Sequence, residues 1–68
     1  MDKQALFRKM EEKNISITEM FKALGMSRSA FYRKCNGKSE FTLGEISRIM
    51  QILGIDDANA IFFSEKVS

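Results

Sequence analysis

The sequence has no histidine, no proline and no tryptophan, and it has one cysteine in 68 residues. The single Cys35 excludes an internal disulfide, and one thiol without histidine leaves no plausible tetrahedral zinc site. No apolar run approaches the ~20 residues that cross a bilayer, and the first residues lack the apolar core of a secretory leader. We therefore expect no metal, no cofactor and no membrane segment, and a cytoplasmic location.

The groups that usually carry catalysis are also scarce. There is no glycine-rich phosphate loop, and the acidic pairs Glu11-Glu12 and Asp56-Asp57 are sequence neighbours, which do not face each other on a helix. A chain of this length makes one domain that hides about 60% of its unfolded surface, with little room for a catalytic pocket. The sequence predicts a single domain over 1–68 that is not an enzyme.

Apolar residues make up 44% of the chain and recur at helical spacing, while four glycines and no proline favour an all-α fold. Each expected helix follows a residue that can cap its first turn. We expect a compact five-helix domain, with helices at about 3–13 after Asp2, from Ser16 to Gly25, from Ser27 to about Cys35, from Thr42 to Gly54, and from Asp56 or Asp57 through Ala60, Ile61 and Phe62.

The second and third helices form the most informative pattern. An apolar stripe on the second helix ends at Gly25, where a residue without Cβ can take positive φ, and Ser27 then caps the third helix. Between Glu19 and Glu40 the chain has five basic and no acidic side chains, which leaves six basic and nine acidic elsewhere. The spacing predicts a helix-turn-helix at about 17–35, and the charge favours a polyanionic partner; a solvated basic face is the alternative reading of the charge.

The third helix has two distinct faces when its residues are rotated by ~100° each. Phe31 and Cys35 fall on the inner side, so Cys35 is expected to be a small buried side chain rather than a reactive thiol. The outer arc carries side chains that can bond base edges or phosphates in a major groove: Arg28, Ser29, Tyr32, Arg33 and Asn36. A polar surface helix with no such role is the alternative.

The run from Leu24 to Lys38 resembles the helix-turn-helix core of the Cro and cI (XRE) repressor family of temperate phages. The spacing of the later helices is also similar to small Cro-like or prophage regulators. The resemblance implies a lambda-repressor-like domain that binds a pseudo-palindromic double-stranded operator as a homodimer. By position it assigns base reading to Arg28, Ser29, Tyr32 and Arg33, and backbone contacts to Ser27, Asn36 and Lys38.

Three residues depart from the family pattern. Ile17 stands where relatives often have a glutamine that braces the third helix, and Phe21 stands where a small alanine is usual, which leaves the docking angle open. Lys34 occupies a place that is often apolar. We expect its stem to follow the edge of the core and its ammonium to escape as a further DNA-backbone contact.

The C-terminal segment ends in an apolar cluster. Phe62 and Phe63 are adjacent, so on a helix they point ~100° apart and one is expected outside the core. With Ile61 and Val67, the exposed ring is the candidate dimer contact. The alternative is a C-terminus that folds back on the core of its own chain.

These observations leave two functions open. The first is a sequence-specific DNA-binding transcriptional regulator of Cro or repressor type, which reads its operator with the third helix and acts by excluding polymerase from a promoter. The second is an antirepressor or other protein-interaction module on the same fold, whose partner would be a repressor protein.

Overall fold

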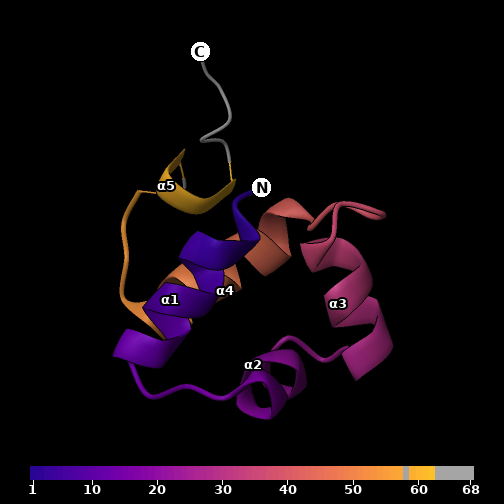
Figure 1. Ribbon diagram of the computed structural model, residues 1–68, viewed down its shortest axis with the longest axis horizontal. Helices are drawn as coiled ribbons and strands as arrows, with labels where there is room; N and C mark the ends of the chain where they lie inside the picture. Colours follow the sequence, from indigo (N-terminus) through magenta and orange to yellow (C-terminus); the bar gives the residue numbers. More distant parts are fainter. Residues whose placement is uncertain (58, 63–68) are drawn as a thin grey trace.

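The computed structural model describes residues 1–57 and 59–62, and this part of the chain contains helices and no strands. The fold class is therefore all-α, as predicted. The helices, shown in Figure 1, are α1 (Lys3–Glu12), α2 (Ile17–Ala23), α3 (Arg28–Cys35), α4 (Leu43–Leu53) and α5 (Asn59–Phe62). No helix in the described residues is long and apolar enough to span a membrane.

The expected count of five helices is not matched. Within the described residues, four helices are seven to eleven residues long, whereas α5 has four residues and forms a single turn. Asp57 acts before this turn, since its Oδ1 accepts a hydrogen bond from the N–H of Asn59 at 3.0 Å.

The starts of α1 to α4 are fixed by local hydrogen bonds. Asp2, Ser16, Ser27 and Thr42 each accept a bond from a backbone N–H in the first turn that follows. In α2 and α4 the third helical residue makes a reciprocal hydrogen bond to the N-cap residue. The carboxylate of Glu19 accepts from the N–H of Ser16 at 2.8 Å, and that of Glu45 accepts from the N–H of Thr42 at 2.9 Å. These two capping boxes were predicted from the sequence, and both are confirmed.

The core is formed by side chains from all five helices. Five are completely buried, namely Leu6, Met20, Phe31, Ile49 and Leu53, and four more are nearly so, namely Met10, Cys35, Ile61 and Phe62. The aromatic rings form an edge-to-face series from Phe31 to Phe41 and from Phe41 to Phe62, with centroids 6.1 and 5.8 Å apart. This series joins α3 to the loop before α4 and to α5, and so fixes α3 on the domain.

The C-terminal turn packs on the chain's own core. The N–H of Asp2 donates to the carbonyl of Ile61 at 2.6 Å, and Ile61 and Phe62 are only 2% and 6% exposed. The expectation that these two side chains form an exposed dimer contact is therefore corrected, because burial in their own monomer leaves almost no surface for a second copy. Phe63 and Val67, the other members of that expected contact, lie outside the described residues.

Candidate nucleic-acid interface

The two central helices are joined by a tight turn within residues 17–35. Gly25 adopts φ +72°, a conformation that side chains with a Cβ disfavour, and the N–H of Met26 donates to the carbonyl of Phe21 at 3.1 Å. Ser27 caps α3 directly after this turn, so α3 begins at Arg28, only five positions after α2 ends at Ala23. The limits agree with the predicted helix-turn-helix.

The inner and outer faces of α3 are divided as the sequence predicts. Phe31 and Cys35 are buried, at 0% and 3% exposure. The outer residues Arg28, Ser29, Tyr32 and Arg33 are all exposed. Burial raises the pKa of the Cys35 thiol to about 11, against a smaller opposing effect of the Lys3 charge, so the thiol stays protonated at neutral pH.

Arg28 reaches back toward α2. Its guanidinium carbon lies 5.6 Å from the centre of the Phe21 ring, and its Nη2 lies 3.5 Å from Thr18 Oγ1, at the outer limit of a hydrogen bond. Phe21, which departs from the family pattern, thus supplies an aromatic face on which the guanidinium is stacked. The guanidinium of Arg28, the first residue of α3, is therefore held against α2, which restricts the directions in which the side chain can point.

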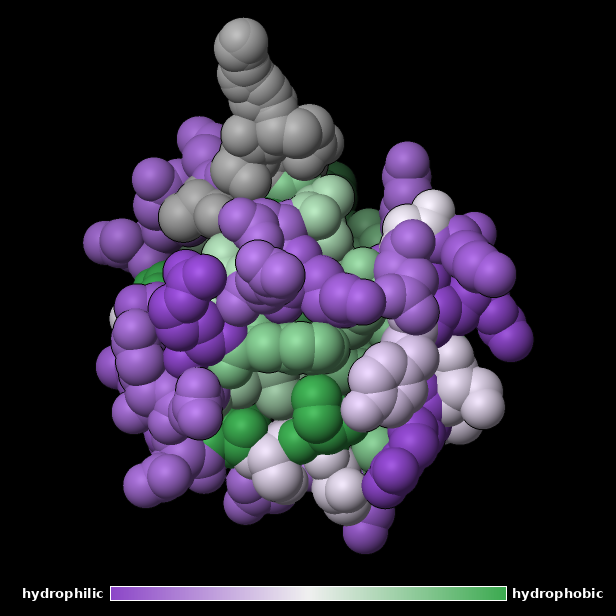
Figure 2. Space-filling view, in the orientation of Figure 1, coloured by the Kyte–Doolittle hydropathy of each residue, from purple (hydrophilic) through white to green (hydrophobic). Residues whose placement is uncertain are grey.

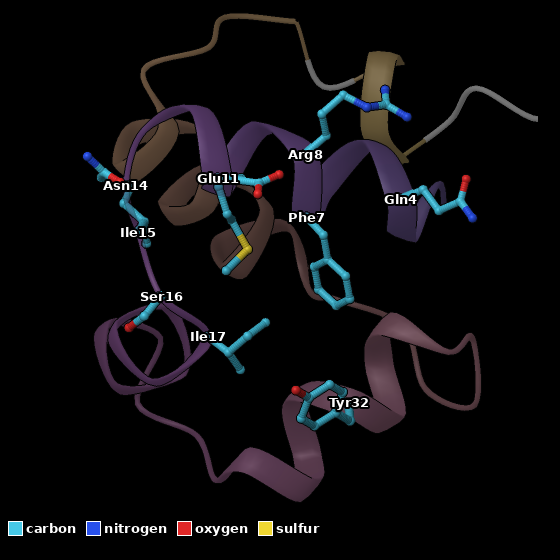
Figure 3. A pocket seen from close by; sticks show the side chains of 10 residues that line it. Gln4, Phe7, Arg8, Glu11, Asn14, Ile15, Ser16, Ile17 and Tyr32 are labelled. Carbon is cyan, nitrogen blue, oxygen red and sulfur yellow. The ribbon is translucent and has the colours of Figure 1, made fainter.

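Tyr32 borders a groove between α1, α2 and α3. Tyr32 is 37% exposed, and its ring packs edge-to-face with that of Phe31, with the two ring centroids 6.0 Å apart. Phe7 of α1, Ile17 of α2 and Tyr32 project into this open groove of about 820 Å³ (Figure 3). We define the apolar groove by the four side chains Phe7, Ile15, Ile17 and Tyr32. Figure 2 shows apolar side chains at the centre of this face, surrounded by hydrophilic ones.

Three of the residues assigned to the DNA backbone lie around the ends of α3. Ser27 Oγ accepts from the N–H of Ala30 at 3.1 Å as the N-cap, and Asn36 Oδ1 accepts from Lys3 Nζ at 2.7 Å. Lys38 is exposed, and its N–H donates to the carbonyl of Arg33 at 3.0 Å after Gly37, which has φ +81°. Of the three side chains, that of Lys38 makes no hydrogen bond or ion pair with the described residues.

The fourth, Lys34, is engaged inside the domain. Its Nζ lies 2.7 Å from Glu45 Oε1, and the two side chains are only 18% and 23% exposed. Nζ also lies 5.9 Å from the centre of the Phe41 ring. The expectation that this ammonium escapes to a phosphate is corrected, because the carboxylate of α4 holds it at the edge of the core.

The electrostatics of Glu45 reflect this contact. Burial by itself would raise the pKa of its carboxyl group. Hydrogen bonds from Lys34 and Thr42, together with the Lys34 charge, outweigh that effect, and the pKa lies below its usual 4.5. Glu45 is therefore ionised at neutral pH and faces a cation.

Sequence reasoning identified Glu45 only as a capping residue and gave Lys3 no role. No local signal marks either contact, because Lys34 and Glu45 are eleven residues apart and Lys3 and Asn36 are 33 apart. The one available signal was a lysine at a place of α3 that is often apolar in the family.

Comparison with known proteins gives one match. The family model of the Cro/C1-type HTH DNA-binding domain matches residues 5–58. No curated protein and no solved structure matches the chain.

Proposed function

The chain belongs to the Cro/C1-type helix-turn-helix DNA-binding family, and from this membership we propose that it is a transcriptional regulator that reads a double-stranded operator in the major groove with α3. The observation that supports this proposal most directly is the exposed face of α3. That face presents Ser29, Tyr32 and Arg33 outward, while Phe31 and Cys35 anchor the opposite face in the core.

Each exposed side chain has a role that suits its chemistry. The guanidinium of Arg33 can bond guanine O6 and N7 in a bidentate manner, and Ser29 can bond several base edges. Arg28 reads from the start of α3 with its guanidinium supported by Phe21. Tyr32 contacts a thymine methyl or a phosphate. Ser27, Asn36 and Lys38 contact the sugar-phosphate backbone and set the register.

The proposed mechanism is exclusion of polymerase from a promoter that the domain occupies. A pseudo-palindromic operator requires two copies of α3 in successive major grooves, about 34 Å apart, so we include a homodimer in the proposal. Its interface is not assigned to Ile61 and Phe62, since both are buried in the monomer.

The first experiment is a selection of bound duplexes from a random DNA pool, followed by titration of the selected sequence and of random DNA at two salt concentrations. We expect an inverted-repeat consensus bound at least ~10³-fold more tightly than random DNA. Weak binding without a consensus, lost as the salt concentration rises, would reject the proposal.

Two substitutions then separate base reading from backbone contact. Arg33→Ala should weaken binding to the selected operator by ~1 to 3 kcal/mol and relax the preference at one base pair, whereas Lys38→Ala should weaken all sequences alike and reduce the salt slope by about one. Arg48→Ala, which removes the same charge from an exposed position of α4, is the control for general charge effects. Equal effects of Arg33→Ala on operator and random DNA would refute the base-reading role.

One observation favours the second candidate function, an antirepressor or protein-interaction module. The apolar groove lies directly beside Tyr32 and includes Ile17, which stands where relatives often have a polar side chain. Tyr32 is exposed and the other three side chains of the groove are partly exposed, and exposed apolar surface is common where proteins bind one another. Under this function, wild-type DNA binding stays at the random-sequence level, and Ile17→Gln reduces association with a purified repressor without changing DNA binding.

A further inference from the structure

Lys34 differs from the other basic residues of the Glu19–Glu40 stretch. Lys22, Arg28, Arg33 and Lys38 are exposed, while the Lys34 side chain is 18% exposed and lies against another helix. Its ammonium is 2.7 Å from Glu45 Oε1 and 5.9 Å from the centre of the Phe41 ring. A cation so placed has little access to a phosphate outside the domain.

We propose that Lys34 is a positioning residue, which through Glu45 fixes the C-terminal end of α3 against the start of α4 and thereby sets the orientation of the DNA-reading face. This inference rests on the proposed function, because the orientation of α3 matters only if α3 reads DNA.

The carboxylate of Glu45 joins two elements through a single oxygen. Oε1 accepts from Lys34 Nζ at 2.7 Å and from the N–H of Thr42 at 2.9 Å, while the N–H of Glu45 donates back to Thr42 Oγ1 at 3.1 Å. The two capping-box bonds with Thr42 orient the Glu45 carboxylate within its own helix, independently of Lys34. Lys34 thus contacts an acceptor that is already oriented, on the first turn of α4.

The loop between α3 and α4 is enclosed by this contact. It begins after Cys35 and ends at Thr42, and it carries Lys38, the proposed phosphate contact. Phe41, at the end of the loop, lies beneath the Lys34 ammonium and packs edge-to-face on Phe31 of α3. The ion pair therefore holds the last turn of α3, which also carries Arg33, and the rings hold its middle.

Asn36 adds a second tether at this end of α3. Its Oδ1 accepts from Lys3 Nζ at 2.7 Å, which connects α3 to the first residue of α1. This contact is exposed, whereas the contact of Lys34 with Glu45 is partly buried. A partly buried pair is less screened by solvent and salt, so it is the stronger constraint of the two.

Three variants test the inference. Lys34→Met keeps the apolar stem and removes the charge. Glu45→Gln removes the opposite charge and keeps the capping box, which accepts Glu or Gln at this position. Glu19→Gln is the matched control, because Glu19 closes the same capping box in α2 and makes no ion pair or hydrogen bond with a cation among the described residues.

Binding to the selected operator and to random DNA is measured at several salt concentrations, at a temperature where circular dichroism shows each variant folded. We expect Lys34→Met and Glu45→Gln each to reduce the preference for the operator about tenfold, within the range of couplings found for contacting residues. The double variant should lose no more of the preference for the operator than either single variant. The salt slope of Lys34→Met should stay within about half a unit of wild type, since no phosphate contact is lost, and Glu19→Gln should match wild type.

Two results would overturn the inference. If Lys34→Met lowers the salt slope by about one and weakens operator and random DNA alike, Lys34 contacts phosphate. If folded Lys34→Met and Glu45→Gln both retain the wild-type preference, the pair has only a structural role. If the wild-type protein itself shows no sequence preference, the proposed function is rejected. The inference on Lys34 is rejected instead if the wild type prefers the operator and the variants give one of the two results above.

Discussion

Truncation of Phe31 to alanine should remove most of the stability of the domain. Phe31 is completely buried on the inner face of α3 and makes edge-to-face contacts with Tyr32 at 6.0 Å and Phe41 at 6.1 Å. No other side chain of α3 is completely buried. Its loss leaves a cavity between α3 and the loop that precedes α4.

The expected cost follows from the burial. Replacement of a buried Phe by Ala typically costs ~3 to 5 kcal/mol. The total stability of a domain of this size is roughly 3 to 10 kcal/mol, so the variant loses a large fraction of it. Since each kcal/mol shifts the melting temperature of so small a domain by about 4 to 8 °C, the melting temperature should fall by at least ~12 °C.

Thermal unfolding followed by far-ultraviolet circular dichroism measures this loss, and urea titration gives the free energy of unfolding. Ser29→Ala is the control, because Ser29 lies on the same helix and is exposed; its effect should stay within ~0.5 kcal/mol. A melting temperature for Phe31→Ala within about 5 °C of wild type would refute the placement of Phe31 as the anchor of α3.

Three further predictions concern the backbone, the thiol and the acid response. Gly37→Ala should lower the free energy of unfolding by about 1 to 2 kcal/mol because of its φ of +81° alone, since an added Cβ would meet no atom within 4 Å. Gly44→Ala, whose Cβ would lie an ordinary 3.9 Å from Thr42 Oγ1, should instead raise it by up to ~1 kcal/mol. Urea titration measures both changes. Cys35, with its pKa raised to about 11, should react with a thiol reagent at neutral pH only after denaturant is added; rapid labelling of the native protein would contradict its burial. Because the pKa of Glu45 is lowered on folding, its contribution to stability is present above pH 4.5 and is lost as the pH falls through the folded value. The stability of Glu45→Gln should therefore depend less steeply on pH in the acid range than that of wild type. Parallel curves of stability against pH would argue against the pair.

The sequence predicted the helix boundaries well because those boundaries are set by interactions over three or four residues. Ser16 with Glu19 and Thr42 with Glu45 close capping boxes within a single turn, and both form as expected. The division of α3 into a buried side with Phe31 and an exposed side follows from helical periodicity, which is also local. The five-helix count was not matched, since α5 is a single turn of four residues within the described residues.

The candidate site was predicted less completely, because long side chains choose partners across the fold. Arg28 stacks on Phe21, and Lys34 pairs with Glu45 instead of reaching outward. Arg28 was expected on the DNA-facing side from its position on a helical wheel. Lys34 was expected at the edge of the core, with its ammonium reaching outward to the DNA backbone. A wheel fixes the direction of a Cβ, but a flexible stem of several bonds lets the charged end follow the nearest partner.

The sequence by itself determined the all-α class, the helix-turn-helix and the family, because caps, glycines at turns and apolar periodicity act within a few residues of one another. The tertiary structure decided which basic side chains face outward and where the C-terminal turn lies. Lys34 and Glu45 come from two helices, and Asp2 meets Ile61 across almost the whole chain. Such contacts depend on how the helices pack, and this packing is set by the shared core around Phe31 rather than by any short stretch of sequence.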